Sequence, residues 1–125
     1  MQSKTRQHIQ MNPAMPFSDA VLAGDTLYIS GRIGLIPGTR TVPADLSEEI
    51  HNLMQDVRNV LKQAEMTMDD LTYVQIFCPD VSLWEAFNKV YQEYFSGPLP
   101  ARAFLGSGKL LFDAHFELQG IAVRS

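Results

Sequence analysis

The chain has 125 residues, of which 46% are hydrophobic and 19% are charged. Ten lysines and arginines against fourteen acidic residues give a formal net charge of −4, which argues against a general nucleic-acid-binding protein. The one cysteine, Cys78, excludes an intrachain disulfide framework and a multi-cysteine zinc site. No stretch reaches the roughly 18 apolar residues of a membrane span. We expect one domain over residues 1–125, soluble and cytoplasmic.

In the first half of the chain, hydrophobic periodicity predicts three strands and one helix. Weak alternation indicates a first strand over residues 5–10. Two β-rich runs at 20–23 and 26–33, separated by the turn signal Gly24-Asp25, predict a hairpin. Apolar residues that recur every three or four positions then predict a helix over 46–65, with its apolar stripe on one face.

The second half of the chain predicts three more strands and a second helix. The segment 71–78 is rich in β-branched and aromatic residues, which favour a strand. A helix over 83–95 is expected to stop before Gly97 and the prolines that follow it. We expect the last two strands over residues 102–105 and 114–123. This order predicts an α+β fold, a two-layer sandwich with two helices on one face of a mixed six-stranded sheet.

The second face of that sheet is expected to be apolar rather than solvated. The last strand places Ile121 and Val123 on the side opposite to Leu118 and Ala122, and the strand over 71–78 is apolar on both sides. An uncovered apolar sheet face is typical of a surface that is buried in an oligomer.

Two charged residues on the late strands are the best candidates for chemistry. Arg102 begins a strand, and its rigid fork of N–H donors suits a substrate carboxylate. A surface arginine or an intersubunit ion pair is the alternative. Glu117 lies between Phe116 and Leu118, where burial would raise its pKa and make it a proton acceptor near neutral pH. A structural ion pair of Glu117 with Arg102 or Arg32 remains open.

The other polar candidates give weaker signals. Ser30-Gly31 interrupts a strand and indicates either close approach of a ligand or a β-bulge. Arg32 either adds positive charge to a site or points to solvent. Cys78 is expected to be a small buried strand residue rather than a nucleophile. The three histidines show no metal-ligand spacing, so we expect no metal site.

Five segments in order resemble motifs of the Rid/YjgF family, the reactive-intermediate (enamine/imine) deaminases, over nearly the whole chain. They are residues 16–21 (PFSDAV), 28–34 (YISGRIG), 87–95 (FNKVYQEYF), 100–102 (PAR) and 116–123 (FELQGIAV). The resemblance implies a chorismate-mutase-like fold and a homotrimer with ligand sites in the three clefts between subunits.

The resemblance also implies a reaction and a set of site residues. Arg102 would bind the substrate carboxylate and Glu117 would position water, so that 2-imino or 2-enamino acids are hydrolysed to 2-oxo acids and ammonia. No cofactor is expected, because a protonated imine is already electrophilic. The implied substrate-binding residues are Phe17, Ser30, Gly31, Arg32, Asn88, Arg102 and Phe104.

Three of these residues depart from the family pattern. Phe17 stands where the family has a tyrosine, Arg32 where it has glutamine, and Phe104 where a small residue is common. We expect Phe104 to narrow the site and to favour small imines, unless it is a core residue. A non-catalytic trimeric binder or sensor of 2-oxo acids or related small carboxylates is a second hypothesis. A ribonuclease is a third, against which the acidic balance argues.

Overall fold

The computed structural model describes residues 6–125, so Thr5 of the predicted first strand lies outside the described residues. Short 3₁₀ turns join several of the longer elements. The elements follow the chain in the order β1 (Arg6–Ile9), β2 (Ala20–Ala23), β3 (Thr26–Ile33), α1 (Leu46–Gln63), β4 (Leu71–Cys78), α2 (Trp84–Tyr91), β5 (Ala101–Gly106) and β6 (Glu117–Val123).

The predicted order of elements is confirmed, and the differences lie at element ends. The second helix stops at Tyr91 and tightens into a 3₁₀ turn over Gln92–Tyr94, ahead of the glycine and prolines. The last strand begins at Glu117 rather than at residue 114. The reason is that the backbone N–H of His115 donates to Oε2 of Glu49 at 2.8 Å and so bonds to a side chain instead of a neighbouring strand.

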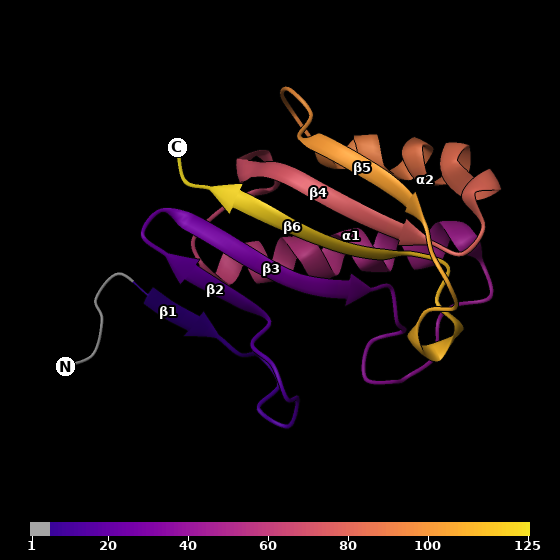
Figure 1. The fold of residues 1–125 in the computed structure, drawn as a ribbon, viewed down its shortest axis with the longest axis horizontal. Helices are drawn as coiled ribbons and strands as arrows, with labels where there is room; N and C mark the ends of the chain where they lie inside the picture. The colour runs from indigo at the N-terminus through magenta and orange to yellow at the C-terminus, as the bar shows by residue number, and fades with distance from the viewer. Residues whose placement is uncertain (1–5) are drawn as a thin grey trace.

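The six strands form one mixed sheet in the order β1-β2-β3-β6-β4-β5. All neighbours are antiparallel except β4 and β5, which run parallel and are connected through α2. Both helices lie behind the sheet in Figure 1, with the strands in front of them. The predicted α+β fold with two helices on one face of a mixed six-stranded sheet is therefore confirmed.

The core lies between the sheet and the two helices. α1 presents its apolar stripe to the sheet, and α2 contributes Phe87, whose ring packs 4.9 Å from that of Phe116 between centroids. Burial of each large apolar side chain stabilises the fold by about 1.5–3 kcal/mol. The fully buried residues of α1 are Ile50, Leu53, Met54, Val57, Val60 and Leu61, together with the carboxylate-bearing Glu49.

The other face of the sheet carries exposed apolar side chains. Tyr28 pairs with Ile121 across β3 and β6, and both point away from the helices. Tyr28 is 51% exposed and Val123, on the same face, is 40% exposed. This is the uncovered apolar face that the alternation predicts. No helix among residues 6–125 is long and apolar enough to cross a membrane.

Candidate functional site

A bulge between β3 and β6 brings Glu117 against Gly31. The register of the two strands shifts between Ile29 and Arg32, so Ser30 and Gly31 stand outside the regular ladder. A Cβ atom at Gly31 would collide with Oε2 of Glu117. A side chain at residue 31 would therefore displace the carboxylate of Glu117, and glycine lets that carboxylate lie directly against the backbone of β3.

The carboxylate of Glu117 is partly buried and carries an uncompensated charge. Within residues 6–125, no cationic side chain forms a salt bridge with it, so an intrachain ion pair with Arg102 or Arg32 is excluded. Burial raises the pKa of Glu117 above its ordinary value. A carboxylate in this state is a better proton acceptor than one in water.

The loop before β2 holds Phe17 beside this bulge. Ser30 Oγ donates to the carbonyl of Ser18 at 2.6 Å, and the side-chain amide of Gln10 donates to the carbonyl of Phe17 at 3.2 Å. Phe17 is 43% exposed. Phe17, Ser30, Gly31 and Glu117 therefore surround the β3–β6 bulge, as four of the residues that the resemblance implies.

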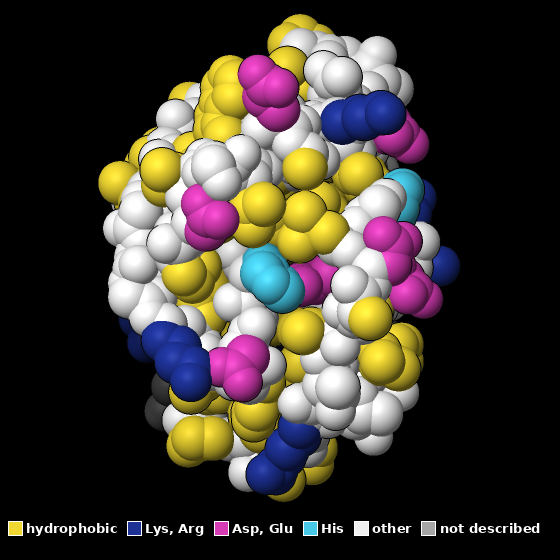
Figure 2. Space-filling model, turned by 90° about the vertical axis from the view of Figure 1, so that its right-hand side faces the viewer, with side chains coloured by type: hydrophobic (Ala, Val, Ile, Leu, Met, Phe, Trp, Pro, Cys, Tyr) yellow, Lys and Arg dark blue, Asp and Glu magenta, His cyan; other side chains and the backbone are white. Residues whose placement is uncertain are grey.

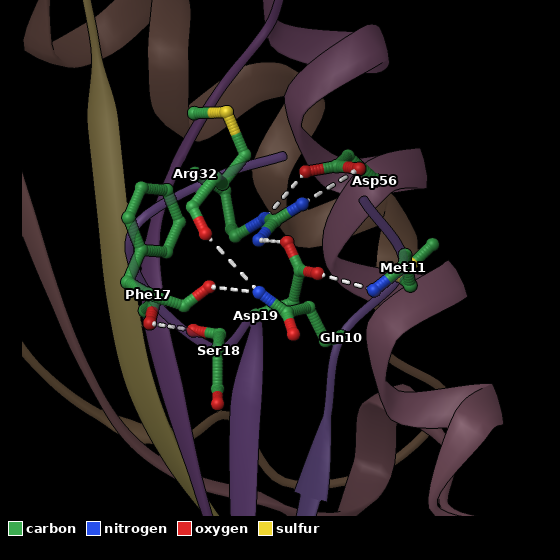
Figure 3. Close-up of polar contacts among 9 residues, drawn as sticks. Gln10, Met11, Phe17, Ser18, Asp19, Arg32 and Asp56 are labelled. Atoms are coloured by element: carbon green, nitrogen blue, oxygen red, sulfur yellow. Dashed lines mark hydrogen bonds and ion pairs between the residues drawn. The ribbon is translucent and has the colours of Figure 1, made fainter. Parts of the chain in front are cut away.

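Arg32 lies on the helix side of the sheet, where two carboxylates bind its guanidinium. Its Nη1 lies 2.7 Å from Oδ1 of Asp19, and its Nε lies 2.6 Å from Oδ2 of Asp56 on α1 (Figure 3). Two carboxylates thus neutralise its charge. Its charge is therefore compensated within the fold rather than pointing to solvent, and its place among the substrate-binding residues stays a prediction of the resemblance.

Asp19 links this ion pair to the loop that carries Phe17. Its second oxygen accepts the backbone N–H of Met11 at 2.6 Å, as Figure 3 shows. Burial alone would raise the pKa of Asp19, but the hydrogen bonds from Arg32 and Met11 outweigh it, and the pKa falls below its ordinary value. The loop is thereby fixed to both β3 and α1.

Replacing Asp19 with asparagine is expected to lower the free energy of unfolding by about 3 kcal/mol, because a buried cation loses one of its partners. Urea unfolding followed by circular dichroism measures this loss. Asp113→Asn is the matched control, since Asp113 forms an exposed pair with Lys109 and should change little. Equal stability of the two variants would show that Arg32 is solvated well enough to need no partner.

Arg102 lies on the edge strand β5 and points toward α2. It pairs with Val74 of β4, whose side chain is fully buried under the helices. The guanidinium carbon lies 4.9 Å from the ring centroid of Tyr91 and 5.6 Å from that of Phe104. No carboxylate lies within salt-bridge distance of Arg102 in the described part of the chain. Its N–H donors are therefore free to bind a ligand carboxylate.

Phe104 and Asn88 lie on the same side of the sheet as Arg102. The ring of Phe104 meets Phe87 edge to face, with centroids 5.7 Å apart, and is packed against the core. Phe104 thus supports the arginine and also belongs to the packed interior. Asn88 stands one helical turn before Tyr91, and its Oδ1 is buried with no hydrogen-bond partner among the described residues.

The residues around Glu117 and those around Arg102 lie on opposite faces of the sheet. Val74 pairs with Arg102, while Phe77 of the same strand pairs with Glu117. Residues three apart in a strand point to opposite sides, so the side chains of Arg102 and Glu117 do as well. With β4 between their strands, a single chain does not bring Arg102 and Glu117 into one site.

The sequence did not reveal which side chains contact Arg102 and Arg32. The spacing of Tyr91 from Asn88 puts both residues on one helix face, but nothing in the sequence assigned Tyr91 a role at the site. Nor did the sequence indicate that Asp19 and Asp56 would converge on Arg32. In residues 6–125 there is no group of three or more histidine, cysteine or acidic side chains that could hold a metal ion.

Known proteins match the chain over nearly all of its length. The family model described as endoribonuclease L-PSP matches residues 7–124. Protein MMF1, mitochondrial, of Saccharomyces cerevisiae is 31% identical over 110 residues, which cover 88% of this chain and 76% of that protein. A 2-iminobutanoate/2-iminopropanoate deaminase of Dermatophagoides farinae is 31% identical over 112 residues, covering 89% and 88%.

Solved structures agree with this match. The crystal structure of yeast Mmf1 superposes with a TM-score of 0.88 at 28% sequence identity, covering 97% of this chain and 100% of that one. The fold, the ordered motifs and the family match thus indicate the same family. The chain belongs to the endoribonuclease L-PSP family, which is also called the Rid/YjgF or RutC family.

Proposed function

We propose that this protein hydrolyses reactive 2-imino and 2-enamino acids to 2-oxo acids and ammonia. The observation that carries the proposal is the state of Glu117, a partly buried carboxylate with a raised pKa and no cationic partner in residues 6–125. A relative at 31% identity that is named a deaminase supports the same reaction. Arg102, also unpaired within the described chain, supplies the complementary charge.

The proposed chemistry assigns one task to each charged residue. The guanidinium of Arg102 binds the substrate carboxylate in a forked pair and so orients the imine carbon. Glu117 accepts a proton from water as the water oxygen attacks that carbon, and the C=N electron pair moves to the protonated nitrogen. Glu117 returns this proton to the amine nitrogen of the resulting carbinolamine. The hydroxyl then gives up its proton to solvent as the C=O bond forms, and the C–N bond breaks to release ammonia and the 2-oxo acid. No cofactor takes part in these steps.

The site is proposed to form between two copies of the chain. Arg102 of one copy would face Glu117 of its neighbour, since the two residues point to opposite sides of the sheet within one chain. The apolar face around Tyr28, Ile121 and Val123 gives a physical reason for the copies to associate. Together with the resemblance, this supports a homotrimer with three sites between subunits.

In solution we expect a particle of about 42 kDa, three times the 14.0 kDa chain. Light scattering coupled to size-exclusion chromatography measures the mass directly. Ile121→Glu should dissociate the particle, because a charge would enter the buried face. Gln63→Glu, on the exposed surface of α1, should leave it intact. A stable monomer of 14.0 kDa at micromolar concentration contradicts the trimer and the shared site.

A coupled assay tests the reaction. An amino-acid oxidase generates imines from several amino acids, and semicarbazide traps the imine that this protein leaves behind. Less trapped imine in the presence of the protein demonstrates turnover and ranks the substrates. Binding of 2-oxo acids without turnover would favour the alternative of a non-catalytic binder or sensor.

Two further aspects of the proposal follow from charge and from the relatives. On the end of the molecule seen in Figure 2, lysine and arginine side chains stand apart among acidic and apolar ones, which gives RNA no continuous basic surface there. We therefore expect no cleavage of RNA, despite the name of the family.

A cytoplasmic location remains our proposal, and the MMF1 relative is named as a mitochondrial protein.

A further inference from the structure

Tyr91 has a buried hydroxyl group that the described chain leaves unpaired. The residue is 3% exposed, and its Oη has no hydrogen-bond partner in residues 6–125. A buried hydroxyl without a partner costs folding free energy, because it loses its bonds to water and gains none. Burial raises the pKa of Tyr91 to about 12, against the opposing charge of Arg102, so the hydroxyl stays protonated at neutral pH.

A second unpaired oxygen lies one turn away on the same helix. Oδ1 of Asn88 is likewise buried without a partner in the part of the chain that the structure describes. Residues three apart on a helix are surface neighbours, so Asn88 and Tyr91 present their oxygens on one side of α2. Buried polar atoms without a partner are rare in folded proteins and call for an explanation, and here both belong to side chains of one helix.

The group that could satisfy both oxygens is Arg102. Its guanidinium carbon lies 4.9 Å from the ring centroid of Tyr91, within range of a cation–π contact. A guanidinium has five N–H donors, and none of those of Arg102 makes a charged pair in residues 6–125. A cation with free donors therefore lies over the ring of a tyrosine whose hydroxyl has no partner in residues 6–125, and Asn88 is on the same helix.

We propose that Tyr91 is a positioning residue for Arg102, and that its hydroxyl, together with Oδ1 of Asn88, receives N–H groups of the guanidinium when a ligand carboxylate binds. The inference rests on the proposed function, because it concerns the same carboxylate-binding arginine. In the free protein the guanidinium rests on the rings of Tyr91 and Phe104. A bound carboxylate takes one edge of the fork, and the remaining donors turn to the two oxygens of α2.

This arrangement gives the hydroxyl opposite effects on stability and on binding. In the free chain it is a buried group without a partner, so its removal should not lower stability. In the complex it holds the arginine through a hydrogen bond to a charged donor, so its removal should weaken binding. A tyrosine that is only part of the core would not separate these two quantities.

The test is Tyr91→Phe, which keeps the ring and removes only the oxygen. Calorimetric titration with 2-oxobutanoate should show a Kd raised roughly tenfold, as expected for the loss of one hydrogen bond to a charged group. In the imine assay KM should rise by a similar factor while kcat at saturation stays within about twofold, because Glu117 and water are untouched. The melting temperature should be unchanged or higher.

Tyr94→Phe is the matched control, since the hydroxyl of Tyr94 has a partner, Nδ1 of His51 at 2.7 Å. This variant should melt at a lower temperature and bind 2-oxobutanoate as the wild type does. The two tyrosines thus predict opposite patterns from the same chemical change.

Each other outcome overturns the inference in a recognisable way. Suppose that the wild type turns over imines and that Tyr91→Phe binds 2-oxobutanoate as tightly as the wild type does. The inference then fails, and the proposed function stands. If Tyr91→Phe melts lower and loses binding only as folded protein is lost, its hydroxyl has a purely structural partner. If the wild type itself neither binds 2-oxobutanoate nor hydrolyses imines, the proposed function fails and the inference with it.

Discussion

Replacing Glu117 with glutamine is expected to slow imine hydrolysis by roughly 10²–10⁴-fold, the usual contribution of a general base. Glutamine keeps the shape of the side chain and its place over Gly31, but it cannot accept a proton from water. Since the carboxylate of the ligand binds to Arg102, the affinity for 2-oxo acids should change only modestly. The two effects separate a catalytic role from a binding role.

Rates and affinities must be measured on the same preparations of the assembled protein. Glu85→Gln, the same change at an exposed position of α2, is the control and should match the wild type. A structural role for Glu117 predicts a different pattern, in which Glu117→Gln melts lower and loses activity only with its folded fraction. Full activity in a folded Glu117→Gln trimer would remove Glu117 from the mechanism.

The pH dependence follows from the raised pKa of Glu117. The base works only when deprotonated, so the rate should fall as the pH drops through a value above the ordinary pKa of 4.5 for this group. Burial is the cause, because it disfavours the charged form. The residual activity of Glu117→Gln should lack this acid limb in a profile of kcat/KM against pH.

The fold was predictable because its main signals are local. The apolar stripe of α1 and the β-branched run of β4 each fall within one element, where a period of 3.6 or 2 is visible in the sequence. The alternation in β6 even placed Ile121 and Val123 on the uncovered face. The ends of α2 and β6 were less predictable, because a 3₁₀ turn and the bond from His115 to Glu49 depend on tertiary contacts.

The candidate site depends on contacts between distant segments, which periodicity does not report. Nothing near Arg32 in sequence reveals that Asp56 on α1 will bind its guanidinium. The relation between Arg102 and Glu117 is set by how β5 and β6 each pair with β4, and a one-residue change of register would put them on the same face. The residue types indicated the chemistry. Only the pairing of β5 and β6 with β4 shows that one chain cannot bring Arg102 and Glu117 into one site.

Replacing Arg102 with alanine is expected to abolish turnover and to weaken binding of 2-oxo acids, because the carboxylate loses its forked partner. Arg102→Lys should recover little, since lysine offers a point charge instead of two parallel hydrogen bonds. Titration with 2-oxobutanoate and the imine assay measure the two losses, and thermal melts check the fold. A folded and fully active Arg102→Ala trimer would end the assignment of a deaminase site at this position.

Mixing the two inactive variants tests whether the site is shared between copies. In a ring of three, each site would take Arg102 from one copy and Glu117 from the next, so equal amounts of Arg102→Ala and Glu117→Gln should restore about a quarter of the sites. The variants are unfolded and refolded together to allow exchange, and activity is compared with wild type treated alike. A mixture of Arg102→Ala with Arg102→Lys is the control, because none of its sites regains an arginine. Mixed trimers without recovered activity would show that Arg102 and Glu117 do not act across an interface, and would leave the binder of small carboxylates as the better account.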